Sequence, residues 1–203
     1  YSALHTGDLL AWLATCLAAC LSPAVAIPVA WSLRTSRQDL PWKQRPPFEL
    51  CRLVSGRVPL MVANSRTGLH VYQGLGFRPR STAVIPNGID AEAFRPDPEA
   101  GRKVRAGWGV AESTPLVGIV GRLAPVKDHP TFLRAAALVA PLAPDAMFVC
   151  VGDGPLTYRA ELMQQAQDLG LGGRLVWAGK RHDMSAVYNA FDVVCLSSRV
   201  EGF

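Results

Sequence analysis

Hydrophobic residues in the second half of the chain occur in short continuous runs, as expected for strands of a parallel sheet that is buried on both faces. Four runs have this character: LVGIVG (116–121), MFVCVG (147–152), RLVWAG (174–179) and DVVCLSS (192–198). Segments with apolar residues at helical spacing separate them. Asp128, His129 and Pro130 are expected to open one such helix, and Asp183 to cap another that ends at Ala190. Four β–α steps in this order predict a Rossmann-like half-sheet.

An uncharged stretch runs from Leu9 to Leu33 and is long enough to cross a bilayer. Pro23 and Pro28 argue against a membrane span, because proline interrupts a helix. We therefore expect a buried helix at 9–21, a turn, and a buried strand at 24–31.

The rest of the first half predicts only one further strand and one further helix. VPLMVANS (58–65) is expected to form the strand, and RTGLHVYQGLG (66–76) a short helix with a glycine cap. VIPNGIDAEAFRPD (84–97) contains an Asn-Gly turn signal and predicts a linker. We expect two domains, 1–98 including the linker and 99–203, both incomplete α/β units.

Composition narrows the class of protein. The 203 residues are 49% hydrophobic and 18% charged, which excludes a disordered tail and a coiled coil. Five cysteines at scattered spacings do not predict a disulfide framework, so a reducing, cytoplasmic compartment is expected.

The net charge of +5 favours anionic partners, and it is concentrated in one region. Residues 34–80 hold nine basic and two acidic side chains. Together with Trp31, Trp42 and Phe48, this block resembles a surface on which single-stranded nucleic acid stacks. No RNA-module signature or metal-finger spacing accompanies it, so solvated arginines are the preferred interpretation and no nucleic-acid partner is expected.

In an open parallel sheet, ligands bind outside the carboxyl ends of the strands. The loop GRLAPVKDHP (121–130) leaves the first strand of the half-sheet and enters a helix N-terminus, which attracts anions. Arg122 offers a planar fork for phosphate oxygens and Lys127 a compact charge, so the pair is a plausible clamp for a diphosphate. The alternative is that both are ordinary solvated charges.

Other chemically capable residues are expected to be structural. Cys16 and Cys20 share a helical face, but no second ligand pair of metal-site type accompanies them, so core packing is favoured and no metal is expected. His129 and His182 stand at predicted helix starts and are expected to serve as caps or face solvent.

Several motifs occur in an order that carries a family resemblance. They are VIPNGID with a following F-x-P, then VGRL, K-D one turn later, VGDGP, the WAG strand and DVVCLSSRVEGF. In order and spacing they resemble the family 4 glycosyltransferases, whose fold is of the GT-B type with two Rossmann-like domains. The resemblance covers essentially the whole chain and is strongest from Val84 to Phe203.

The resemblance implies a retaining transferase that moves a sugar from a nucleoside diphosphate sugar to an acceptor, as in glycan biosynthesis. By the match, Arg122 and Lys127 would bind the donor diphosphate and stabilise the charge on the leaving nucleotide, the task that a metal performs in other transferases. Glu201 would contact hydroxyls of the donor sugar. The backbone N–H groups of Gly202 and Phe203 would face the phosphates.

The resemblance also assigns donor-binding roles to glycines at two strand ends. Gly121, Gly152 and Gly154 would let the backbone approach the nucleotide. No cofactor is implied beyond the nucleoside diphosphate sugar, which is a substrate.

The chain departs from the family pattern at both ends and near residue 34. The second glutamate of the family, eight positions after the first, would follow Phe203, and the glycine-rich loop would precede Tyr1, so we expect an inactive interior fragment. Arg34 stands near the position where many members have a histidine that approaches the reacting sugar. Arg34 and His5 are the acceptor-side candidates.

Two functions remain open on the sequence alone. The preferred one is a glycosyltransferase, cytoplasmic, whose basic block would touch an anionic membrane at the inner face and whose acceptor is a sugar, a polysaccharide or a lipid-linked sugar. The alternative is a non-catalytic module that binds a nucleotide or nucleic acid through one Rossmann-like half.

Overall fold

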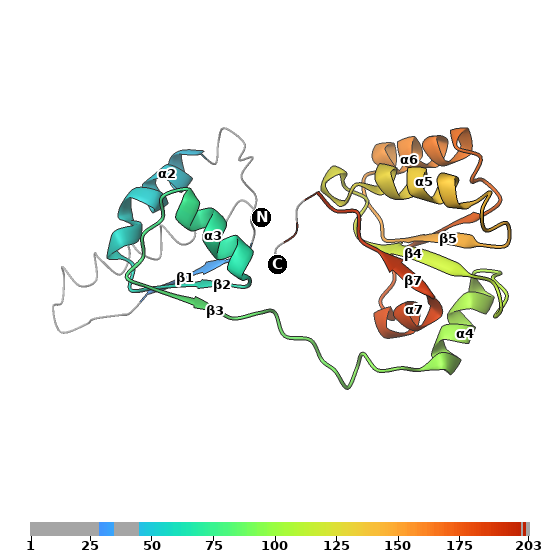
Figure 1. The fold of residues 1–203 in the computed structure, drawn as a ribbon, viewed down its shortest axis with the longest axis horizontal. Coiled ribbons are helices and arrows are strands. Elements are labelled where there is room, and N and C mark those ends of the chain that lie inside the picture. Colours follow the sequence, from blue (N-terminus) through green and yellow to red (C-terminus); the bar gives the residue numbers. More distant parts are fainter. Residues whose placement is uncertain (1–28, 35–44, 200, 202–203) are drawn as a thin grey trace. The chain divides into compact units, whose positions relative to one another are not determined.

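The computed structural model describes residues 29–34, 45–199 and 201 (Figure 1). Two compact units make up this part of the chain. The first ends at Gly88 and includes Glu201, and the second spans Ile89–Arg199. The domain limits expected from the sequence, 1–98 and 99–203, remain a prediction.

The first unit is a parallel three-stranded sheet with helices on one face. Its strands are β1 (Ala30–Leu33), β2 (Leu60–Ala63) and β3 (Ser81–Val84), in the order β1-β2-β3. Its described helices are α2 (Arg45–Val54), the short 3-10 turn η2 (Ser55–Arg57) and α3 (Arg66–Gly74). Alternate strand residues point to one face and meet both helices in a single core.

Aromatic rings fill that core. Phe77 lies 5.2 Å from Phe48 and 5.1 Å from Tyr72 between ring centroids, both in edge-on geometry. Trp31 is 2% exposed and Phe48 7%, so two of the three aromatics that could have stacked on nucleic acid are buried. The third, Trp42, lies outside the described residues.

The second unit is a parallel four-stranded sheet covered on both faces. Its strands are β4 (Leu116–Val120), β5 (Met147–Val151), β6 (Leu175–Gly179) and β7 (Val193–Cys195), in the order β6-β5-β4-β7. The helices α5 (His129–Val139) and α6 (Leu156–Asp168) lie over one face, and α4 (Pro98–Gly107) and α7 (Met184–Ala190) over the other (Figure 1). The turn η3 (Pro125–Lys127) precedes α5.

Both faces of this sheet are apolar, which is why its strands read as continuous hydrophobic runs. Phe148 and Cys150 of β5 pack toward α5 and α6, whereas Val149 and Val151 pack toward α4 and α7. The four strands predicted from these runs are confirmed, as is the parallel arrangement.

Three elements were not predicted. The helix α2 lies in the basic block, β3 ends at the start of the expected linker, and α4 begins directly after that linker. The Asp97 side chain accepts a hydrogen bond from the Ala100 N–H at 3.0 Å and so caps α4. The predicted cap at Asp183 is wrong, because that carboxylate pairs with Arg181 and makes no capping bond.

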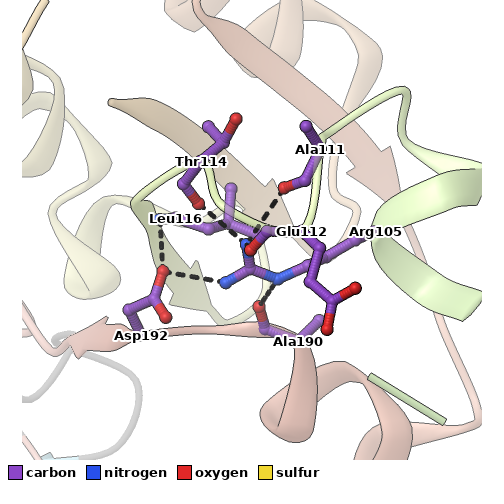
Figure 2. A network of polar contacts seen from close by, with 7 residues as sticks. All are labelled: Arg105, Ala111, Glu112, Thr114, Leu116, Ala190 and Asp192. Atoms are coloured by element: carbon purple, nitrogen blue, oxygen red, sulfur yellow. Dashed lines mark hydrogen bonds and ion pairs between the residues drawn. The ribbon is translucent and has the colours of Figure 1, made fainter. Parts of the chain in front are cut away.

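A buried arginine joins the elements at the amino ends of β4 and β7 (Figure 2). The Arg105 guanidinium donates to the carbonyl oxygens of Ala190 and Thr114, each at 2.7 Å, and to that of Glu112 at 3.1 Å. It also pairs with Asp192 at 2.8 Å, and the same carboxylate oxygen accepts from the Leu116 N–H. This network lies at the end of the sheet opposite to the loops expected to bind ligand.

The expectations for the uncharged N-terminal stretch are only partly covered. Within the described residues, no helix is both long and apolar enough to cross a membrane. Of the strand expected at 24–31, only the last two residues lie in β1, which runs from Ala30 to Leu33, and residues 24–28 are outside the described part of the chain. The predicted helix at 9–21 also lies outside the described residues, together with Cys16 and Cys20.

Candidate functional site

The loops after β4 and β5 lie against each other at the carboxyl edge of the second unit's sheet. The Gly121 N–H donates to the Val151 carbonyl at 2.9 Å, and the Leu123 N–H donates to the Asp153 carbonyl at 3.0 Å. Two hydrogen bonds therefore fix the start of the loop 121–130, which we call the arginine–lysine loop after Arg122 and Lys127, relative to the end of β5.

Glycine is required where these two loops meet. Gly152 has φ +138, and a Cβ there would lie 1.9 Å from the Gly121 carbonyl oxygen. A Cβ on Gly154 would lie 2.2 Å from the Leu123 carbonyl oxygen. The resemblance assigned these glycines to the nucleotide, whereas the close approach that the structure shows is to the neighbouring loop.

Arg122 and Lys127 stand at the two ends of one short loop. Arg122 is exposed, while Lys127 is half-buried at the end of η3. The methylene chain of Lys127 lies over Gly121, whose ideal Cβ position would be 3.6 Å from the Lys127 Cγ and Cδ atoms. Lys127 stands just before α5, and its side-chain stem therefore reaches back to Gly121, the residue that precedes Arg122.

The Asp128 side chain connects this loop to the segment that follows β7. Its Oδ2 atom accepts from the Thr131 hydroxyl at 3.0 Å and from the Arg199 Nε–H at 3.1 Å. The hydrogen bond from Arg199 is the main reason that the pKa of Asp128 lies below its usual range. The sequence predicts Asp128 only as the residue that opens the helix, and the K-D pair after the turn is the one sequence feature that marks this position.

The prediction for His129 is wrong. The side chain is fully buried, and within the described residues neither ring nitrogen has a hydrogen-bond partner. Burial, and to a smaller degree the charge of Lys127, lowers the pKa of His129, which favours the neutral form of the imidazole. Phe132, in the same first turn of α5, packs against Phe148 of β5. His182 is exposed, as expected.

Neither cysteine of the second unit is poised for chemistry. Burial raises the pKa of Cys150 to about 12 and also raises the pKa of Cys195, which disfavours the reactive thiolate. In the described parts of the chain, no group of three or more His, Cys, Asp or Glu side chains is placed to hold a metal ion.

The remaining donor-side residues lie at the end of the chain. Glu201 is half-buried and follows Arg199 by two residues. Gly202 and Phe203 are outside the described residues, so their expected contacts with phosphate remain predictions.

The first unit has a pocket of its own, about 430 Å³ in volume, at the carboxyl ends of β1, β2 and β3. Arg34 is the one charged residue in its described lining, and Ser32, Asn64 and Asn87 supply polar side chains. Arg34 is exposed and, among the described residues, makes no hydrogen bond or ion pair. The other acceptor-side candidate, His5, lies outside the described residues.

Comparison with known proteins adds a family match and named relatives. The model of the family "Glycosyl transferases group 1" matches residues 102–203. The chain is 36% identical over 126 residues to the UDP-Gal:alpha-D-GlcNAc-diphosphoundecaprenol alpha-1,3-galactosyltransferase of Escherichia coli, covering 61% of this chain and 32% of that protein.

A second relative is the GDP-mannose-dependent alpha-(1-6)-phosphatidylinositol monomannoside mannosyltransferase of Mycolicibacterium smegmatis. It is 30% identical over 120 residues, covering 58% of this chain and 31% of the relative. Among solved structures, HepE of Anabaena in complex with UDP superposes with a TM-score of 0.78 at 26% identity, covering 97% of this chain and 50% of HepE. The chain therefore matches between 31% and 50% of the length of these proteins.

Proposed function

Because this chain belongs to the glycosyl transferases group 1 family, with parallel α/β units of the GT-B type, we propose that the protein transfers a sugar from a nucleoside diphosphate sugar to an acceptor, with retention of anomeric configuration. The observation that carries the proposal is the loop after β4. It presents Arg122 and Lys127 beside the N-terminus of α5, at the sheet edge where parallel α/β proteins bind ligands.

The proposed task of this loop is to hold the donor diphosphate and to stabilise its departure. When the glycosidic bond to the diphosphate breaks, negative charge grows on the leaving phosphate oxygens. The Arg122 guanidinium can meet two of these oxygens at once, and the Lys127 ammonium adds a compact charge. The first N–H groups of α5 add a positive dipole end.

Further donor contacts are proposed from the family match. Glu201 would accept hydrogen bonds from hydroxyls of the donor sugar, and the N–H groups of Gly202 and Phe203 would face the phosphates. Gly121, Gly152 and Gly154 would let the backbone of the two loops approach the nucleotide. Named relatives use UDP-Gal or GDP-mannose, and HepE crystals hold UDP and UDP-glucose, so both uridine and guanosine donors belong in the assay.

The pocket of the first unit is the proposed acceptor side. Its described lining combines one cation with polar side chains and no carboxylate, which suits a ligand with hydroxyls and an anionic group. The acceptors named for two relatives, a diphosphoundecaprenol and a phosphatidylinositol mannoside, both carry phosphate. We propose that Arg34 pairs with a phosphate of a lipid-linked acceptor. His5 stays a second candidate on this side.

A lipid-linked acceptor is consistent with a peripheral contact at the cytoplasmic face of a membrane. Helix α2 exposes Leu50 and Leu53, with exposed fractions of 43% and 67%, and the exposed Arg45 and Arg57 lie at and just beyond its ends. Apolar side chains beside arginines suit an anionic lipid surface. This contact and the cytoplasmic location are part of the proposal.

Turnover of the full-length protein tests the donor site. UDP- and GDP-sugars are supplied with a lipid-linked acceptor, and Arg122→Ala and Lys127→Ala are each expected to lower turnover by about 100- to 1000-fold, since each removes one charge-stabilising group. Arg102→Ala, which removes an exposed arginine of α4, is the matched control and is expected to retain activity. Near-normal turnover in both loop variants would refute the assigned roles.

The same assay separates the transferase from its alternative. A protein that binds nucleotide with an intact Arg122 yet transfers no sugar from any donor to any acceptor would be a binding module.

A further inference from the structure

Asp128 has an unusual backbone conformation for its residue type. Its φ of 49 and ψ of 47 place it in the left-handed region, and among the described residues it is the one non-glycine with positive φ. Aspartate and asparagine tolerate this region better than other side chains, but it still costs free energy. Surrounding contacts must therefore maintain it.

Those contacts come from the segment after β7. The Ser197 hydroxyl lies 3.0 Å from the carbonyl oxygens of both Lys127 and Asp128, and the Arg199 N–H donates to the Val126 carbonyl at 2.9 Å. The Arg199 side chain adds its bond to the Asp128 carboxylate. We call Asp128, Ser197 and Arg199 the β4–β7 latch.

Burial makes the latch more than a surface ion pair. The Arg199 side chain is 68% exposed, but that of Asp128 is only 11% exposed, and its Oδ1 atom is buried without a hydrogen-bond partner in the described part of the chain. A carboxylate in such a position depends on its remaining partners, Arg199 and Thr131. The negative charge of Asp128 also acts on Tyr158 of α6: burial is the first cause that raises the pKa of Tyr158, and the Asp128 carboxylate is the second.

We propose that Asp128 is a positioning residue that fixes Lys127 through the β4–β7 latch. The latch binds the carbonyl oxygens of Val126, Lys127 and Asp128. It therefore fixes the backbone position of Lys127, whose side-chain stem lies over Gly121. This inference rests on the proposed role of Lys127 in stabilising the leaving diphosphate. A displacement of about 1 Å in such a group costs on the order of 100-fold in rate.

The kinetic test uses the full-length protein and a cycle with Lys127. Asp128→Asn keeps the tolerance for positive φ and removes the charge, and Arg199→Gln removes the partner. Each is expected to lower kcat by about 10- to 100-fold with the donor KM changed by less than about threefold, because the negative charge that Lys127 faces is largest in the transition state, when the diphosphate leaves. In the Lys127→Ala background, Asp128→Asn is expected to add no further loss.

Two controls accompany the cycle. Arg181→Gln breaks the exposed Arg181–Asp183 pair in the same unit and is expected to leave kcat unchanged. Asp128→Gly relieves the backbone cost but removes the carboxylate, so it is expected to lower kcat as Asp128→Asn does.

Amide hydrogen exchange, measured without any substrate, tests the latch independently of catalysis. Exchange in peptides covering 126–131 and 197–199 is expected to accelerate together in Asp128→Asn and in Arg199→Gln, and not in Arg181→Gln. Unchanged exchange, or an equal kcat loss from Asp128→Asn with and without Lys127, would overturn the proposal. Faster exchange in a protein that transfers no sugar would support the latch and refute the proposed function.

Discussion

At the scale of single residues, Gly152 is where the architecture of the site is least tolerant. A side chain there meets both a φ of +138 and the Gly121 carbonyl oxygen. Gly152→Ala is expected to lower the free energy of unfolding by about 3 kcal/mol and to weaken nucleotide binding, since the loop after β4 must move.

Chemical denaturation together with nucleotide titration measures both effects. Gly173→Ala is the matched control, because Gly173 has open space around it and no positive φ. Equal stabilities for the two variants would contradict the packing described for these loops.

His129 predicts a pH dependence of stability. Its folded pKa lies below the ordinary 6.5, so the unfolded chain binds the proton more tightly, and the stability from the neutral buried ring is lost as the pH falls below 6.5. The free energy of unfolding is expected to decrease by up to about 1.4 kcal/mol per pH unit there.

His129→Leu replaces the unpartnered ring by an apolar side chain and is expected to flatten this dependence between pH 7.5 and 5.5. Calorimetry at several pH values on both proteins provides the comparison. The same slope in the variant would assign the titration to another group.

Residue chemistry was predictable where it depends on sequence order. Arg122 and Lys127 could be proposed from the loop that they flank, because a strand, a turn and a helix start are all visible in the sequence. The burial of His129 and the left-handed conformation of Asp128 could not, because both arise from the packing of α5 on the sheet and from Ser197 and Arg199, which are about seventy residues away.

At the scale of elements, the Arg105 network places a buried charge among polar groups of the second unit. The Arg105 guanidinium, which projects from α4, bonds to the 111–116 segment, to the end of α7 and to Asp192 just before β7 (Figure 2). Arg105→Met is expected to destabilise this unit by about 3–5 kcal/mol, since several carbonyl groups lose their donor in a buried place.

Denaturant unfolding of Arg105→Met beside Arg102→Met, the exposed arginine of the same helix, measures this effect. A difference below about 1 kcal/mol between them would show that the network contributes little to stability.

Elements with a strong apolar signature were predictable and weaker ones were not. The strands β4 and β5 are mostly buried, and the edge strands β6 and β7 carry the same continuous hydrophobic runs although Val193 and Val194 of β7 are exposed. By contrast, β3 is a four-residue strand that begins with two polar residues, and α4 begins at Pro98 itself, in a proline-containing stretch that indicated a linker. The order β6-β5-β4-β7 required the structure, because sequence gives strand succession but not strand neighbours.

At the scale of the whole molecule, each described unit has its own core and its own polar sheet edge. The first unit combines the Arg34 pocket with the exposed leucines of α2, and the second carries the arginine–lysine loop. If the acceptor is linked to a membrane lipid, the intact protein is expected to bind vesicles that contain anionic lipid more tightly than neutral vesicles. Added salt is expected to weaken this binding.

Vesicle sedimentation tests this prediction with Leu53→Glu, which is expected to weaken binding. Leu142→Glu changes an exposed leucine of the other unit and serves as the control. Equal affinity for neutral and anionic vesicles would remove the membrane from the proposed function while leaving the donor site untouched.

The central claim is that the loop after β4 binds a nucleoside diphosphate, and a thermal-shift titration with UDP, GDP and their sugars tests it most directly. Ligand binding is expected to raise the free energy of unfolding by RT ln(1 + [L]/Kd), so the melting temperature should rise with ligand concentration, more for one base than for the other. This rise should vanish in Arg122→Ala. An equal rise in wild type and Arg122→Ala, or no rise with any nucleotide in the full-length protein, would contradict the account.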